Sequence, residues 1–221
     1  MRGDAGTHDK ALPFILYRKG YPEEIYVTFS CSPIPNDRGS FDGILCPVTD
    51  ETERIISERQ LALLHELAYK TGHAGGSKEA CSLAARALET NPHDLPFALI
   101  YAIDAGTRVA SLTGTAGMLP RGNKAAPVRV APDTPCLWPL DQVSRSRQST
   151  VISDLTSVLD ELPTVRGRRP LAQAVVMPLP DSSDVLVVGL NPLRLLDDAY
   201  QRFLDLVAAR TFLSHFQEPN V

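Results

Sequence analysis

Residues 96–114 read PFALIYAIDAGTRVASLTG, and this stretch decides how the larger part of the chain is expected to fold. Its first half is a continuous apolar run, a pattern that is typical of a strand buried on both faces. DAGT at 104–107 is a turn signal, and RVASLTG at 108–114 can pair with the first run as a second strand. The stretch therefore predicts a central strand together with an antiparallel neighbour.

Helical patterns precede and follow this hairpin. Apolar residues from Ala80 to Leu88 recur at helical spacing, Ser77 can cap that helix, and Asn91 with the following proline ends it. A longer helix is expected to begin near Asp197, because carboxylates suit the positive end of a helix. The side of this helix that is expected to lie across the sheet comprises Tyr200, Phe203, Leu206, Val207, Arg210 and Leu213.

Further strands are predicted between these helices. A short helix is expected within 137–148 and a strand within 149–155, and DSS at 181–183 joins two final strands, 172–180 and 184–192. The order of the elements predicts an α+β fold, in which helices pack on one face of an antiparallel sheet.

The first 50 residues predict a smaller, separate sheet. Ile25, Val27, Phe29 and Cys31 alternate with polar residues, PNDRG at 35–39 supplies a turn, and residues 41–48 are apolar again. Residues 13–18 provide a third strand, so the three form a meander.

The four cysteines are expected to be thiols. The register that matches the two apolar faces brings Cys31 near Cys46, and a cross-strand disulfide is allowed by that geometry. Two packed thiols are favoured because the chain shows no signal peptide and is expected to be cytoplasmic. Spacings typical of zinc ligands are lacking around Cys81 and Cys136, so no metal site is predicted.

A linker helix is predicted from 49 to 71, a range without Gly or Pro. Ile56, Gln60, Leu63 and Leu67 follow a spacing that suits either a parallel coiled coil between two chains or packing on the neighbouring domain. His65 lies in a His-Glu-Leu sequence but lacks the rest of a phosphoacceptor motif, so it is interpreted as a surface residue.

Charge and hydropathy exclude two classes of partner. The formal charge is −4 without a long basic run, which argues against nucleic-acid binding. No apolar run approaches the roughly 20 residues of a membrane helix, so membrane insertion is not expected.

The order of these elements resembles that of two families. YVTFSCSPIPNDRGSFDGILCPVTDETERI at 26–55 resembles the C-terminal half of a PAS domain of sensor histidine kinases in two-component signalling. Residues 73–216 resemble a GAF domain, through DLPFALIYAID, LTGTAG, WPLDQV, VISDL and GLNPLRLLDDAYQRFLDLVA. The resemblance implies a disordered tail at 1–10, an incomplete PAS-like domain at 11–50, a linker helix at 51–72, a GAF-like domain at 73–216 and a tail at 217–221. Because the last strand of a PAS sheet pairs with the first, it also implies that residues 41–48 carry an unpaired edge.

The resemblance implies a non-catalytic sensory or regulatory input module of a phosphorelay that lacks the kinase output domain. A small molecule would bind between the sheet and its loops, and a homodimer could form through the linker helix or the exposed sheet edge. Two alternatives remain open. One is a GAF-fold thiol-dependent reductase, and the other is a truncated gene product without independent activity.

The candidate pocket residues are Cys136 and Trp138. They follow residues 114–136, which are rich in Gly, Ala and Pro and predict a long loop over a site. Trp138 is expected to be a partly buried anchor of the short helix, or else a ring that stacks on a ligand. Cys136 would be the nucleophile of the reductase alternative, which requires a resolving cysteine nearby. No catalytic residue and no cofactor are predicted.

Overall fold

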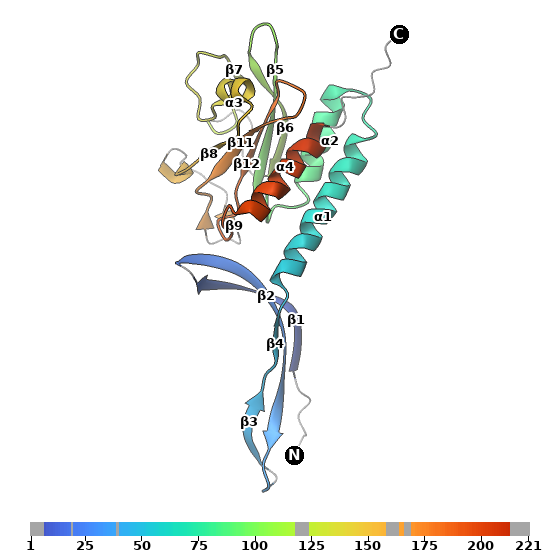
Figure 1. Ribbon diagram of the computed structural model, residues 1–221, viewed down its shortest axis with the longest axis vertical. Coiled ribbons are helices and arrows are strands. Elements are labelled where there is room, and N and C mark those ends of the chain that lie inside the picture. The colour runs from blue at the N-terminus through green and yellow to red at the C-terminus, as the bar shows by residue number, and fades with distance from the viewer. Residues whose placement is uncertain are drawn as a thin grey trace. The chain divides into compact units, whose positions relative to one another are not determined.

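The chain divides into two compact units, Met1–Arg59 and Gln60–Val221, and each is described by itself (Figure 1). The computed structural model describes residues 7–18, 20–38, 40–117, 124–157, 164–165 and 169–212. Residues 1–6 of the predicted N-terminal tail, the end of the predicted GAF-like domain at 213–216 and the tail at 217–221 lie outside these ranges. Among the described residues, no helix has the length and apolar character needed to cross a bilayer.

The first unit is an antiparallel sheet with β2 (Tyr21–Pro35) at its centre. β1 (Thr7–Arg18) pairs with one edge of β2, while β3 (Phe41–Leu45) and β4 (Val48–Asp50) pair with the other. β1 extends into the range that was predicted as a tail, because Thr7 lies opposite Cys31 and continues the ladder. Pro47 has no N–H to donate, which is consistent with the break between β3 and β4.

Cys31 and Cys46 form a disulfide, and the prediction of two thiols is wrong for this pair. The predicted register is right, since Cys31 of β2 and Cys46, the residue after β3, have Cα atoms 4.4 Å apart. That separation falls within the range that a disulfide spans. Cys81 and Cys136 are free, as expected.

Much of the apolar surface of the first unit is exposed. Its buried apolar side chains include Ile25 and Tyr26, whereas Ile44 is 71% exposed. The other exposed large apolar side chains of this unit are Phe14, Leu16, Tyr17, Ile34, Phe41, Leu45 and Val48. In the part of the chain that the structure describes, β3 pairs with β2 alone, so the predicted free edge is present.

A buried ion pair joins β2 to the first turns of α1 (Thr52–Thr71). Arg59 Nη2 lies 2.5 Å from Glu24 Oε1, and the Glu24 side chain is only 1% exposed. The Tyr26 hydroxyl lies 3.3 Å from the Glu24 carboxylate and 3.2 Å from Arg59 Nη1. The buried carboxylate of Glu24 therefore has polar partners, as a polar group without access to water requires.

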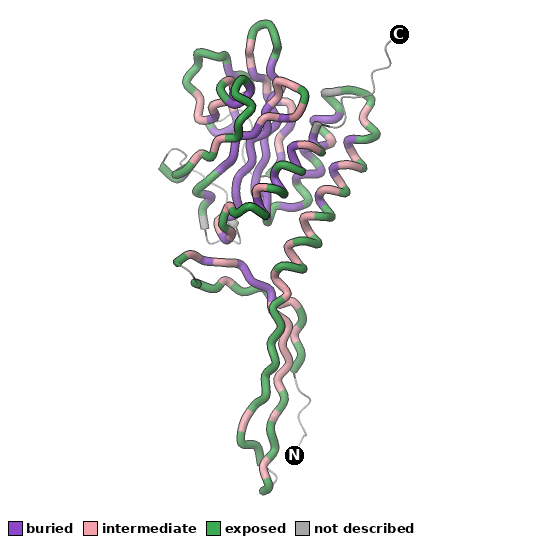
Figure 2. Tube along the Cα trace, in the orientation of Figure 1, coloured by how far each residue is buried: buried purple, intermediate pink, exposed green. Residues whose placement is uncertain are grey.

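The second unit is built on a six-stranded antiparallel sheet of order β7-β6-β5-β12-β11-β8. β5 (Phe97–Ile103) lies between β6 (Ala110–Gly117) and β12 (Val185–Gly189), which confirms the predicted central strand. The remaining strands are β7 (Arg129–Val130), β11 (Ala174–Pro178) and β8 (Thr150–Ile152). Figure 2 shows that this sheet is largely buried.

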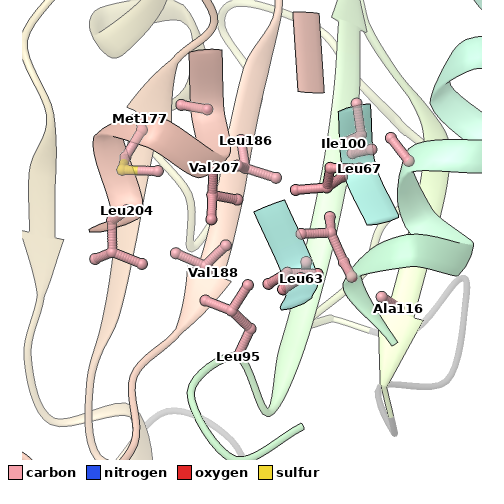
Figure 3. Close-up of a cluster of buried hydrophobic side chains, with 14 of the residues drawn as sticks. Leu63, Leu67, Leu95, Ile100, Ala116, Met177, Leu186, Val188, Leu204 and Val207 are labelled. Atoms are coloured by element: carbon pink, nitrogen blue, oxygen red, sulfur yellow. The ribbon is translucent and has the colours of Figure 1, made fainter. Parts of the chain in front are cut away.

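Helices cover one face of this sheet. α2 (Ser77–Leu88), α4 (Asp198–Phe212) and the second half of α1 pack there around alternate residues such as Ile100 and Val188 (Figure 3). Leu63 and Leu67 of α1 belong to this core, so the two leucines of the predicted seam are not on the surface. Gly114 lets α2 approach β6 closely, because a Cβ atom there would lie 2.8 Å from the Cys81 carbonyl oxygen.

The opposite face is covered by α3 (Leu140–Ser146) and the segments around it. Phe97 and Trp138 meet there with ring centroids 6.1 Å apart, while the neighbouring Ala98 belongs to the helix-face core. The helices are therefore not confined to one face as predicted, since α3 packs on the second. The remaining short elements are η1 (Leu155–Ser157), β9 (Thr164–Val165) and β10 (Arg169–Pro170).

A buried polar network joins the segments that precede β5 and α4. Asp94, which is wholly buried, accepts a hydrogen bond of 2.8 Å from Asn91 Nδ2 and pairs with Arg194 Nη1 at 3.2 Å. Tyr200 of α4 donates its hydroxyl to the Asp94 carbonyl and accepts a hydrogen bond from the Asn191 N–H. The network fixes the start of the central strand to the last helix.

Candidate functional site

The candidate site lies on the second face of the sheet, where the segment before α3 runs past Trp138. The indole is only 1% exposed and donates from Nε1 to the Ala125 carbonyl over 2.7 Å. The expectation of a partly buried ring is wrong, because this hydrogen bond and the contact with Phe97 hold the ring inside. Trp138 nevertheless forms part of a cavity wall.

The first cavity, of about 280 Å³, lies between β7 and the start of α3. Arg108, a lining residue, donates from Nε to Asp141 Oδ1 over 3.0 Å and from Nη2 to Ser144 Oγ over 3.0 Å. Ser144 in turn donates to the Ser183 carbonyl over 2.7 Å. The cation in this wall is therefore neutralised by a carboxylate, and the wall is tied to the β11–β12 turn.

The second cavity, of about 480 Å³, shares Val130, Thr134 and Cys136 with the first. Its wall adds the cations Lys124 and Arg129. Pro127, Pro135 and Leu137 complete the lining, and none of the described residues in it is Asp or Glu. The two cavities therefore differ in charge, although one loop borders both.

Cys136 lies on the wall that both cavities share, and its thiol is partly buried. Burial raises the pKa of Cys136, and hydrogen bonds with the backbone groups of Trp138 and Leu137 offset this in part. Burial also raises the pKa of Tyr101, whose hydroxyl donates to the Pro127 carbonyl over 3.1 Å. Both groups are consequently neutral near pH 7.

The other free cysteine lies across the sheet. Cys81 belongs to α2 and to the core on the helix face, whereas Cys136 lines the cavities on the second face. Burial raises the pKa of Cys81 as well, and a hydrogen bond with the Thr113 side chain opposes this. Within the second unit, the sheet therefore separates the two thiols that a disulfide-forming mechanism would need.

The structure can be compared with the sequence predictions for metal ligands and for site residues. Among the described residues, no three His, Cys, Asp or Glu side chains gather as a metal site would require. The predicted candidates Cys136 and Trp138 do share the wall of the first cavity. Sequence reasoning missed Arg108, Lys124 and Arg129, because each lies in a turn or an aperiodic segment whose position depends on long-range pairing.

No protein-family model matches the sequence, and no curated protein matches it. Solved structures do match the fold. A GAF sensor protein from Burkholderia vietnamiensis is 15% identical, with coverage of 73% of this chain and 90% of that chain and a TM-score of 0.50.

Two further structures are similar at lower TM-scores. The GAF domain of an Acinetobacter phosphoenolpyruvate-protein phosphotransferase is 14% identical in sequence, covers 69% of this chain and 89% of that chain, and has a TM-score of 0.49. A free methionine-R-sulfoxide reductase from Neisseria meningitidis, solved with its substrate, is 13% identical, over 69% of this chain and 85% of that chain, at 0.47. At sequence identities this low, similarity to a solved structure shows the fold alone. The chain contains a GAF-domain fold.

Proposed function

We propose that this protein is a non-catalytic sensory or regulatory input module, whose GAF-fold unit takes a small molecule in the cavities beside Cys136 and Trp138. The observation that carries the proposal is the composition of that site. Two cavities of about 280 and 480 Å³ meet at one half-buried, neutral thiol, and the lining combines apolar side chains with a few polar groups. Such a composition is typical of small-molecule binding sites.

The N-terminal unit fits the same role. Its resemblance to the end of a PAS domain, together with the GAF fold, supports an origin in a phosphorelay sensor. α1 contributes Arg59 to the first unit and Leu63 and Leu67 to the core of the second. A helix that is held by an ion pair in its first half and by buried leucines in its second half is suited to relay a change in the sheet.

The thiol-dependent reductase is the competing candidate, because Cys136 borders both cavities. A reductase of this kind needs a reactive thiolate and a resolving cysteine close by. The raised pKa of Cys136 keeps the thiol protonated near neutral pH, and Cys81 lies on the other face of the sheet. We therefore favour binding over turnover.

A ligand screen tests the proposal directly. We expect at least one class among nucleotides, haem, amino acids and small carboxylates to raise the melting temperature, because a ligand that binds only the folded state stabilises it. Absence of any shift across the screen would overturn the proposal and favour a truncated product without independent activity.

Two variants test whether the ligand binds in these cavities. Thr134 is exposed and lines both cavities, so Thr134→Phe should fill the site without disturbing the core. Ser149→Phe adds a ring at an exposed position outside both linings and serves as the matched control. The thermal shift should disappear in the first variant and persist in the second. Reduction of free methionine sulfoxide by the wild type, lost in Cys136→Ser, would instead establish the reductase.

A further inference from the structure

We propose that the cavity bordered by Lys124 and Arg129 selects a small organic anion with an apolar body. The inference rests on the proposed function and names the chemical class of the ligand. The two cations would bind the negative group, and Pro127, Val130 and Leu137 would contact the apolar part.

The charges in the second cavity favour an anion. Lys124 and Arg129 are exposed, and within the described part of the chain neither forms an ion pair with a carboxylate. Arg108 in the neighbouring cavity provides the contrast, since Asp141 already neutralises it. Among the described residues, the second wall thus offers two positive charges without an ion pair, and no described lining residue carries a negative charge that would repel an anion.

The backbone that carries the cations is held in place. Ala125 accepts the Trp138 indole hydrogen bond at 2.7 Å, which fixes the residue next to Lys124. The carbonyls of Pro127 and Val128 accept hydrogen bonds from the Tyr101 hydroxyl and the Leu112 N–H, at 3.1 and 2.9 Å. A wall fixed before binding loses less conformational entropy when the ligand arrives.

The rest of the lining suits an apolar body. Pro127, Val130, Pro135 and Leu137 supply apolar surface, and a cavity of about 480 Å³ has the size of a small-molecule site. Burial raises the pKa of Cys136, so this thiol adds no negative charge near pH 7. A small carboxylate with an aromatic or aliphatic body combines the required features.

Titration calorimetry with paired probes tests the inference on the full chain. Phenylacetate is compared with phenylacetamide and octanoate with octanamide, because each pair differs in charge but hardly in shape. We expect each carboxylate to bind about tenfold more tightly than its amide, and salt to weaken only the carboxylates. Equal affinity within both pairs, or no binding by any of the four compounds, would overturn the inference.

Variants of Lys124 and Arg129 test whether these two side chains cause the preference for carboxylates. Lys124→Gln and Arg129→Gln should each weaken carboxylate binding about three- to fivefold, the upper part of the range for exposed ion pairs, and leave amide binding unchanged. Arg202→Gln removes an exposed cation from α4, outside the cavity, and should change neither. A carboxylate preference that survives in the Lys124→Gln/Arg129→Gln double variant would also contradict the inference. If neutral compounds from the screen still bind and Thr134→Phe abolishes that binding, the proposed function stands even though the anion preference fails.

Discussion

At the residue scale, Asp94 is a charged side chain without access to solvent. Asn91 and Arg194 satisfy its carboxylate, and the Arg194 guanidinium also lies 4.6 Å from the centre of the Tyr200 ring. Removal of one partner from a buried pair leaves the other charge uncompensated, which costs more than the pair itself contributes.

We expect Asp94→Ala to lower the free energy of unfolding by about 3–5 kcal/mol, because Arg194 would remain largely buried without its carboxylate. Urea unfolding followed by circular dichroism measures the loss. Asp205→Ala is the control, since Asp205 is exposed on α4 and should cost less than about 0.5 kcal/mol. Similar losses in the two variants would contradict the structural role of the network.

Cys136 allows a pH prediction. Its pKa in the folded protein lies above the ordinary value of 9.0 because the thiol is partly buried. The folded state therefore binds this proton more tightly than the unfolded state, and the stability from this group is lost as pH rises from 9.0 through the folded pKa. We expect the alkylation rate of Cys136 by iodoacetamide to reach half its maximum at a higher pH in folded than in urea-unfolded protein.

Peptide mass spectrometry measures the alkylation of Cys136 separately from that of Cys81. Alkylation of Cys81 in the folded protein should be slower still, because that thiol is buried in the core. If the alkylation rate of Cys136 in the folded protein reached half its maximum below pH 9, the thiolate would be stabilised, which would support the reductase candidate.

At the scale of elements, the disulfide is the main covalent constraint on the first sheet. It joins β2 to the residue after β3 and closes a loop with a sequence separation of 15. A loop of that length corresponds to about 3 kcal/mol of stabilisation in the chain-entropy description.

We expect the Cys31→Ser/Cys46→Ser double variant to lose hydrogen-exchange protection in β2 and β3. The reason is that the unfolded state of the first unit gains freedom when the cross-link is absent. Cys81→Ala, a change in the second unit, should leave these amides unaffected. Unchanged exchange in the double variant would show that the strands are held by other interactions.

The sequence predicts elements well where burial follows a simple period. The runs that became β5, β11 and β12 are apolar throughout, because both faces of those strands are covered. α4 shows where the period was assigned incorrectly. Leu206 was expected to face inward but is half-exposed, whereas Leu204, half a turn away, is in the core. The buried residues Tyr200, Phe203, Leu204 and Val207 follow the i, i+3, i+4, i+7 spacing of one helix face, which excludes Leu206.

The residues of the candidate site were harder to predict than the strands, because most of them show no periodic pattern. Cys136 and Trp138 stand out by residue type, but Lys124 and Arg129 are ordinary cations in an aperiodic segment. Arg129 reaches the cavity because β7 pairs with β6 opposite Ser111, a contact between residues far apart in the chain. The Cys31–Cys46 pair differs again, since the strand register was predictable and the oxidation state was not.

At the scale of the whole molecule, we propose that two copies associate through the edge of β3. Phe41, Ile44 and Leu45 are exposed there, and among the described strands only β2 pairs with β3, which leaves the other edge of β3 open. Two β3 strands related by a twofold axis can pair antiparallel, so one contact satisfies both copies. The alternative seam on α1 is less suited, since Leu63 and Leu67 are in the core.

Sedimentation equilibrium should then show a concentration-dependent dimer. Ile44→Lys should shift the equilibrium to monomer, because a charge on an edge strand opposes pairing. Leu206→Lys introduces the same charge at a half-exposed site on α4 and should leave the dimer intact. A wild-type protein that stays monomeric at every concentration would refute the association.

The position of Trp138 has a practical consequence. It is the single tryptophan of the chain, it is shielded from water, and it borders the cavity. Its fluorescence therefore comes from one known place, and we expect an occupant of the first cavity to alter the emission. The protein would then report, without any attached dye, whether that cavity is filled.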